Sequence, residues 1–279
     1  MALMWITVLL FTTVVSAVVI RHEHAEQSIK EGLTDETERV VGGQVSNQEM
    51  FPWTVALYND ATFICTASII SATSVLTAAH CVVFNRVAQE PSMFNAMIGD
   101  VNRTSMNAQQ IFFKKINVHP DYDNLQSDLA ILETTEPIKF SNRIRPICIA
   151  NQKIGRLILK SVVAMGWGQV SRENETNPDV LHYTKQRVVS NLKCSILYIG
   201  RKTPENTLCA SGLFSGVCYG DSGGPLVYMQ GKQPIQVGVA SYVNAFVGCG
   251  TKLGPAGFTR VSSFTDYIMT TATGKVCVA

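Results

Sequence analysis

The chain has little charge, and its charge is not clustered. Charged residues make up 16% of the 279 residues, the formal net charge is +2, and no run of lysines or arginines occurs. A protein that binds nucleic acid needs a basic patch to neutralise phosphates, so the composition argues against that class. The chain is long enough for one large or two modest folded domains.

The eight cysteines lack the C-x-x-C spacing of zinc and redox sites. Eight cysteines in a chain of this length suit an oxidising compartment and allow up to four disulfides. Two sequons, at Asn102 and Asn174, would be glycosylation sites on the surface of a secreted protein.

The first 20 residues carry no charge, and no later apolar stretch is long enough to span a membrane. An apolar run from Leu3 to Val15 ends in the small residues Ser16 and Ala17, which is typical of a signal peptide over residues 1–17. The alternative is an uncleaved signal anchor, because 20 residues could just cross a bilayer. We therefore predict a secreted, extracellular protein.

Residues 18–39 have a composition that cannot build a core. They contain three basic and six acidic residues, and apolar character starts abruptly after Arg39. An exposed basic residue between such a segment and a folded body is a natural cleavage point. We predict an activation propeptide over residues 18–39, cleaved between Arg39 and Val40.

From residue 51 onward, short apolar segments alternate with Gly, Pro and Asn, which favours an all-β barrel or sandwich. The expected strands are Trp53–Tyr58, Phe63–Ile70, Ala96–Ile98, Phe112–Val118, Leu129–Leu132, Val162–Trp167, Thr184–Val189, Leu226–Met229, Ile235–Tyr242 and Gly257–Val261. Residues 262–275 fit one helix capped by Ser262 or Ser263. A seam near residues 151–155 divides the folded part into residues 40–152 and 153–279, two similar lengths.

Residues 220–224 read GDSGG and fit the G-x-S-x-G pattern of the α/β-hydrolases. The catalytic order of those enzymes is serine, acid, histidine, but no histidine follows Ser222. That excludes an α/β-hydrolase. The order histidine, aspartate, serine is available in His80, Asp128 and Ser222.

Four motifs occur in this same order along the chain. VVGG (40–43), LTAAHC (76–81), DLAIL (128–132) and GDSGGP (220–225) resemble the chymotrypsin/trypsin family of serine endopeptidases, and the resemblance covers residues 40–268. It implies an all-β fold of two six-stranded antiparallel barrels with a C-terminal helix. Residues 40–152 and 153–279 would each form one barrel of a single peptidase domain, 40–279.

The resemblance also implies the chemistry. Ser222 would attack a peptide carbonyl to form an acyl-enzyme, His80 would take and return the proton, and Asp128 would orient His80. The N–H groups of Gly220 and Ser222 would form the oxyanion hole. No cofactor is needed, and the loop from Asp100 to Gln110 has too few acids for the calcium site of some relatives.

The family resemblance further implies a zymogen. The carboxylate of Asp221 would pair with the α-amino group of Val40, which cleavage after Arg39 would free. Asp221 cannot orient His80, because neighbouring residues on such a turn point apart.

By resemblance, the cysteines pair as Cys65–Cys81, Cys194–Cys209 and Cys218–Cys249. Cys148 and Cys277 remain. We predict that they pair with each other, and the alternative is two free or intermolecular thiols.

The specificity pocket is expected to select apolar residues. By resemblance its residues are Gly216, Val217, Tyr219, Ser241, Tyr242, Val243 and Ala256, with Leu125 lining the next subsite. Without an acid at Gly216, an arginine or lysine side chain would be buried unpaired. Because Val217 and Val243 narrow the pocket, we predict cleavage after small or medium apolar residues. The alternative is a chymotrypsin-like preference for larger apolar residues.

The same pocket predicts the partners. An enzyme that does not cut after arginine cannot activate itself at Arg39, so we predict a separate trypsin-like activating protease. The other partners are protein or peptide substrates and protein protease inhibitors, and we predict a monomer. A catalytically weak binding or decoy homologue is the other reading, favoured by CTASII (65–70) where the family often has CGGSLI.

Overall fold

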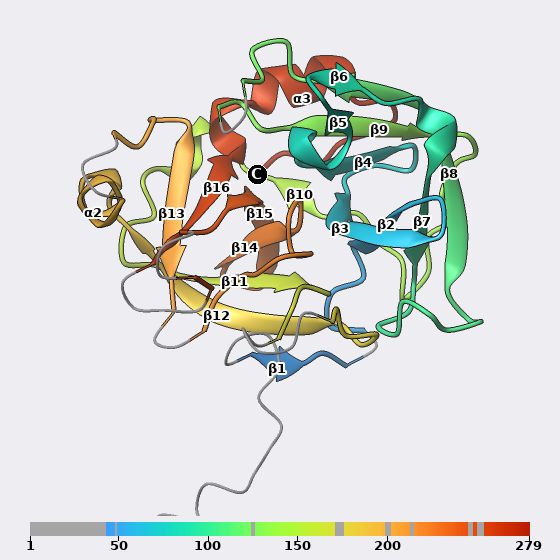
Figure 1. Cartoon of the computed structure of the whole chain (residues 1–279), viewed down its shortest axis with the longest axis horizontal. Helices are drawn as coiled ribbons and strands as arrows, with labels where there is room; N and C mark the ends of the chain where they lie inside the picture. Colours follow the sequence, from blue (N-terminus) through green and yellow to red (C-terminus); the bar gives the residue numbers. More distant parts are fainter. Residues whose placement is uncertain are drawn as a thin grey trace, which may run out of the picture. The chain divides into compact units, whose positions relative to one another are not determined.

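The computed structural model describes residues 43–47, 49–123, 126–170, 176–198, 202–212, 215–244, 248–249 and 254–279. Their strands form two closed six-stranded antiparallel barrels, shown in blue-green and in yellow to red in Figure 1. The predicted fold class is thereby confirmed. Within these residues, no helix has both the length and the apolar character needed to cross a membrane.

The first barrel closes in the order β2, β3, β4, β9, β8, β7. Its strands are β2 (Thr54–Asn59), β3 (Thr62–Ile69), β4 (Ser74–Thr77), β7 (Phe94–Ile98), β8 (Gln109–Val118) and β9 (Ala130–Thr134). A small hairpin of β5 (Val83–Phe84) and β6 (Val87–Ala88) and two 3-10 turns, η1 (Ala79–Cys81) and η2 (Pro91–Met93), lie between β4 and β7.

The second barrel follows the order β12, β11, β14, β15, β16, β13 and closes by pairing β13 with β12. Its strands are β11 (Ser161–Gly166), β12 (His182–Val189), β13 (Thr207–Ser211), β14 (Pro225–Gln230), β15 (Gln233–Tyr242) and β16 (Ala256–Arg260). Two short strands from earlier in the chain join its sheet: β1 (Gln44–Val45) pairs with β12, and β10 (Cys148–Ile149) runs parallel to β15.

Alternation along each strand divides the apolar side chains between separate cores. On β2, Val55 and Leu57 point into the first barrel, whereas Ala56 and Tyr58 join a cluster that lies between the barrels. That cluster takes residues from both barrels, including Trp167 at 1% exposure. The barrels therefore share a buried interface, and the segments that cross it are held in fixed positions.

The C-terminal helix α3 (Thr265–Thr271) starts later than predicted. The expected serine cap is wrong, because both serines belong to the 3-10 turn η4 (Val261–Ser263), and the N-cap residue is Phe264, without a side-chain cap. The helix packs on the first barrel, where the rings of Tyr267 and His119 lie 4.5 Å apart. The other helical segments in the described part of the chain are α2 (Asn191–Leu197) and the turn η3 (Gln152–Ile154).

Candidate active site

The structure brings His80 and Asp128 together at the edge of the first barrel. His80 lies in η1, directly after β4, and its Nδ1 donates to Asp128 Oδ2 over 2.7 Å. Asp128 is fully buried, and its Oδ1 accepts from the His80 backbone N–H at 3.0 Å. Two hydroxyls of the second barrel complete the cage: Ser241 donates to Asp128 Oδ2 (2.6 Å) and Thr259 to the Asp128 carbonyl (2.8 Å). Because a carboxylate only accepts, Nδ1 of His80 keeps its proton and Nε2 is left as a base.

The loop of Ser222 packs against the segment that carries His80. Gly223, with φ of +77°, fits so closely that a Cβ there would collide with the hydroxyl of Thr77 and approach the backbone N of Ala78 to 3.1 Å. These two residues directly precede the histidine segment, and the Ser222 carbonyl accepts from Thr66 N at 2.9 Å. Only glycine adopts this backbone while allowing such an approach.

Two backbone N–H groups of this loop are left open. Among the described residues, the N–H groups of Gly220 and Ser222 donate no hydrogen bond, and none joins Ser222 Oγ to His80 Nε2. Gly220 has φ of +98°, a conformation that side chains disfavour. Open donors on a fixed turn beside a serine are what an oxyanion hole would require, and a serine–histidine hydrogen bond often forms only when substrate binds.

Asp221 is buried beside this loop, at 1% exposure. Its Oδ1 accepts from Gly168 N and its Oδ2 from Cys218 N, both over 2.8 Å. Burial raises the pKa of its carboxyl to about 6, against the opposing effect of these two hydrogen bonds. No cationic side chain of the described residues pairs with it. The predicted partner Val40 and the cleavage residue Arg39 lie outside the described residues.

The region predicted to form the pocket contains a small cavity of about 10 Å³, which is room for the centre of one water molecule. Four of the predicted pocket residues line it together: Gly216, Val217, Val243 and Ala256. The others that line it are Gln186, Ala210, Ser211, Gly212, Ser215, Cys249 and Gly254.

Three other residues predicted to bind substrate are not among those that line this cavity. Tyr219 is 61% exposed, Ser241 is bonded to Asp128, and the ring of Tyr242 stands edge-on to that of Tyr198 with centroids 5.5 Å apart. Leu125 lies outside the described residues.

The sequence was also compared with models of protein families. The family model described as Trypsin matches residues 40–268. The chain belongs to the trypsin family of serine endopeptidases. It is also similar to rat (Rattus norvegicus) "Transmembrane protease serine 9", with 31% identity over 237 residues, or 83% of this chain and 22% of the relative. The chain thus spans about a fifth of that relative's length.

Thr66 is a contact of the trypsin-family loop that sequence reasoning did not identify. It is fully buried on β3. Its Oγ1 donates to the Gly220 carbonyl at 3.0 Å and accepts from the Trp167 backbone N–H at 3.4 Å. The available signal was the departure of CTASII from the usual CGGSLI of the family. This hydroxyl ties the turn of Gly220 to the first barrel.

Gln186 is a second residue that motif reading missed. It lies on β12 at 2% exposure and lines the small cavity, and neither its Nε2 nor its Oε1 has a hydrogen-bond partner in the described structure. The signal was the alternation in HYTKQRVV, whose burial pattern places Gln186 on the inner face of the strand.

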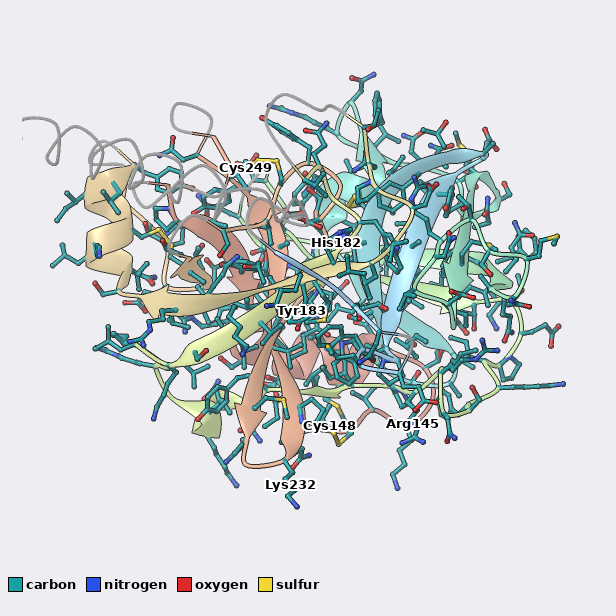
Figure 2. The ribbon with its side chains drawn as sticks, turned by 90° about the horizontal axis from the view of Figure 1, so that it is seen from below. Arg145, Cys148, His182, Tyr183, Lys232 and Cys249 are labelled. Carbon is teal, nitrogen blue, oxygen red and sulfur yellow. A yellow bond between two sulfur atoms is a disulfide. The ribbon has the colours of Figure 1, made fainter. Side chains whose placement is uncertain are left out.

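Four disulfides hold the loops of this trypsin-family domain: Cys65–Cys81, Cys148–Cys277, Cys194–Cys209 and Cys218–Cys249. In Figure 2 the disulfide of Cys249 lies in the upper part of the view and that of Cys148 in the lower part. The first bond fixes the segment of His80. It also means that the group of Cys65, His80 and Cys81, whose ligand atoms lie within 4.8 Å of one another, offers no thiolate to a metal.

Of the two sequons, only the first lies in the described residues. The side-chain Oδ1 of Asn102 accepts from the N–H of Thr104 at 3.0 Å and from its hydroxyl at 2.8 Å. Asn174 lies outside the described residues.

Proposed function

We propose that this chain is an active serine endopeptidase, made as a secreted zymogen, that cleaves after small or medium apolar residues. The observation that carries the proposal is the buried Asp128 holding His80 Nδ1 at 2.7 Å, next to a serine loop with two open N–H donors. A decoy homologue has no need of this arrangement.

In this mechanism, His80 Nε2 removes the proton of Ser222 Oγ as that oxygen bonds to the scissile carbonyl carbon. The carbonyl oxygen becomes an oxyanion, held by the N–H groups of Gly220 and Ser222. His80 then gives the proton to the departing amine as the C–N bond breaks. A water molecule repeats the same steps on the acyl-enzyme and releases the acid.

Activation would use the buried carboxylate of Asp221. Cleavage between Arg39 and Val40 would free an α-amino group, and a positive charge beside Asp221 would offset the desolvation that raises its pKa. Gly216 stands where a protease that cuts after arginine would have an acidic residue in its pocket. The enzyme would therefore need a separate trypsin-like protease to cut after Arg39.

Labelling with a fluorophosphonate tests the proposal. The intact chain should label weakly, and the same chain cut by a trypsin-like protease should label strongly and begin at Val40 by N-terminal sequencing. Ser222→Ala is the control that should never label. A cut chain that stays unlabelled would be a decoy, and rapid self-activation of the pure intact chain would contradict the apolar pocket.

A peptide library with varied residues before the scissile bond separates the proposed specificity from its alternative. We expect cleavage after Ala, Val or Leu; a preference for Phe would indicate the chymotrypsin-like alternative. Assay of the medium and membranes of expressing cells tests secretion against retention through residues 1–20, as the transmembrane relative suggests. Gel filtration with and without a protein protease inhibitor tests for a monomer that forms an inhibitor complex.

A further inference from the structure

In the described part of the chain, the amide of Gln186 is buried without the hydrogen bonds that a buried amide normally makes within a protein. Both polar atoms of its amide lack a partner in the described structure, and the residue is 2% exposed. A second buried glutamine provides the contrast: Gln236, at 0% exposure, accepts from Ser68 Oγ at 2.8 Å and donates to the Gly238 carbonyl at 3.3 Å. Leaving a buried donor or acceptor unpaired costs stability, so Gln186 needs a partner that the chain itself does not supply.

The position of Gln186 indicates where that partner would come from. It lines the small cavity together with Val217 and Val243, and the hydroxyl-bearing Ser211 and Ser215 line it too. The lining of this pocket is therefore mixed, with polar side chains as well as valines. A cavity that admits about one water can hold that water only if several polar groups contact it, and the amide offers both a donor and an acceptor.

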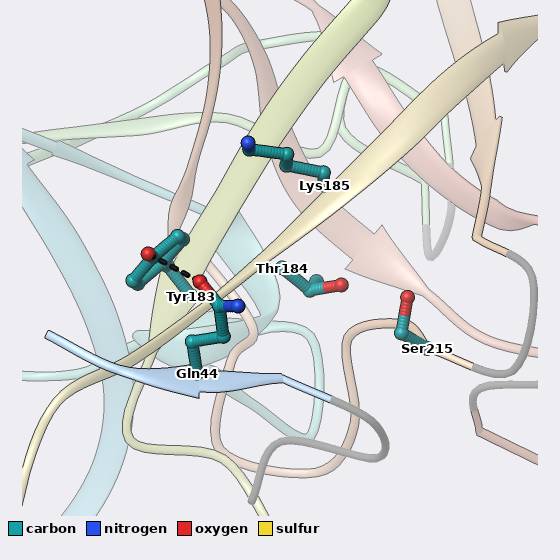
Figure 3. Close-up of a pocket in the computed structure, with 5 residues that line it drawn as sticks. All are labelled: Gln44, Tyr183, Thr184, Lys185 and Ser215. Atoms are coloured by element: carbon teal, nitrogen blue, oxygen red, sulfur yellow. Dashed lines mark hydrogen bonds between the residues drawn. The ribbon is translucent and has the colours of Figure 1, made fainter. Parts of the chain in front are cut away.

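A neighbouring cavity extends the polar surface along β12. It has a volume of about 170 Å³ and is lined by Gln44, Tyr183, Thr184, Lys185 and Ser215 (Figure 3). Thr184 lies two residues before Gln186 on β12, on the same buried face of the strand. Its Oγ1 is also buried without a hydrogen-bond partner in the described structure. Ser215 lines both cavities, so they adjoin. Unsatisfied polar groups along the strand thus border both spaces.

We propose that Gln186 determines specificity by selecting small substrate side chains that carry a hydroxyl, threonine and serine, at the residue before the scissile bond. This inference rests on the proposed function and revises one part of it. The size limit set by Val217, Val243 and Ala256 is the same and apolar residues of that size are still cleaved, but residues of that size with a hydroxyl are cleaved faster. The amide Oε1 accepts from the substrate hydroxyl and Nε2 donates to its oxygen. An apolar side chain of equal size leaves both atoms unpaired.

The test uses pairs of peptide substrates that differ only in this side chain, threonine against valine and serine against alanine, with the cut and activated enzyme. Threonine and valine are nearly equal in size, so their kcat/KM ratio isolates the hydroxyl. We expect threonine to be preferred at least about tenfold, the effect of one hydrogen bond. Gln186→Met should bring the ratio to one or below, and Gln186→Leu provides a second apolar replacement.

Gln236→Met is the matched control, because it removes a buried amide away from the cavity and should leave the ratio as in the wild type. A merely structural role of Gln186 would change both substrates alike. Equal cleavage after threonine and valine by the wild type would overturn this inference and leave the proposed function standing. A threonine-to-valine ratio of kcat/KM that is unchanged in Gln186→Met would do the same. Cleavage only after large or basic residues would overturn both, and absence of fluorophosphonate labelling would overturn the activity itself.

Discussion

The two barrels supply groups of different kinds to the site. From the first come His80 and Asp128, and both carboxylate oxygens of Asp128 have partners, one of them a hydroxyl of the second barrel. From the second come the loop of Ser222 and the pocket, where the N–H groups of Gly220 and Ser222 and the amide of Gln186 have no partner in the described structure.

This difference distinguishes the groups that would orient the catalytic side chains from the groups that would recognise substrate. Groups that must hold a catalytic side chain in place are satisfied by the protein, because any freedom there would misplace the base. The groups that we propose meet substrate are left open, because a donor already paired within the chain could not stabilise a transition state or recognise a side chain. The open groups lower stability, so the two regions should respond in opposite directions to substitution.

The largest expected effect comes from breaking the satisfied region. In Asp128→Asn the amide nitrogen cannot accept from His80, so the imidazole is no longer held in the tautomer that leaves Nε2 as base. We expect kcat/KM of the activated enzyme to fall by about 10⁴-fold. The exposed Asp266 on α3 gives the control Asp266→Asn, which should behave as the wild type. A loss smaller than tenfold in Asp128→Asn would mean that another group orients the histidine.

The next effect concerns Asp221 in the intact chain. Its folded pKa of about 6 lies above the ordinary 3.8, so the folded state binds more protons than the unfolded state between these values. The free energy of unfolding therefore falls as pH rises from about 4 to about 6, and the cost is fully present above that range. Asp221→Asn has no such carboxyl. The difference in free energy of unfolding between Asp221→Asn and the wild type should therefore shift in favour of the variant by about 2 to 3 kcal/mol when the pH is raised from 4 to 7.

Urea unfolding of the intact wild type and of Asp221→Asn at the two pH values measures this difference. In the cut enzyme the new amino group should remove the dependence, because an ion pair lowers the pKa of the carboxyl. The same variant should nevertheless fail to gain activity on cutting. Parallel pH curves for the two intact proteins would show that the carboxyl is already satisfied before cleavage.

Much of this fold could be predicted from the sequence, because most strands are marked by apolar residues between turn residues. All ten expected segments overlap strands of the two barrels. Of the barrel strands, β4 and β13 were missed; they are four and five residues long, and TLCAS in β13 has little apolar alternation. The two-residue strands β1 and β10 exist only through pairing with β12 and β15, which local sequence does not encode.

The site divides in the same way. His80, Asp128 and Ser222 belong to motifs whose residue types the family's chemistry requires, so they could be proposed from the sequence alone. Thr66 acts on Gly220 from 154 positions away, and Gln186 matters only because the barrel closes around it. Contacts of this kind arise from tertiary structure, and a motif cannot show them.

A smaller effect is expected where the two regions are joined. Thr66→Val keeps the shape of the side chain but removes the hydroxyl that donates to the Gly220 carbonyl. The turn that presents the open N–H groups would then be less fixed, so kcat should fall about tenfold with KM nearly unchanged. Thr66→Ser restores the hydroxyl and should recover most of kcat. A raised KM at normal kcat, or no rescue by serine, would refute this positioning role.

The smallest effect compares the two buried glutamines directly. Gln236→Met leaves the hydroxyl of Ser68 without its acceptor, so the free energy of unfolding should fall by about 1 to 2 kcal/mol. Gln186→Met removes two polar atoms that have no partner and keeps the volume, so stability should stay the same or rise. Urea denaturation of the two variants measures both effects. Equal losses would mean that water held in the cavity satisfies the amide of Gln186. The second barrel would then have fewer unpartnered polar groups than its protein contacts indicate.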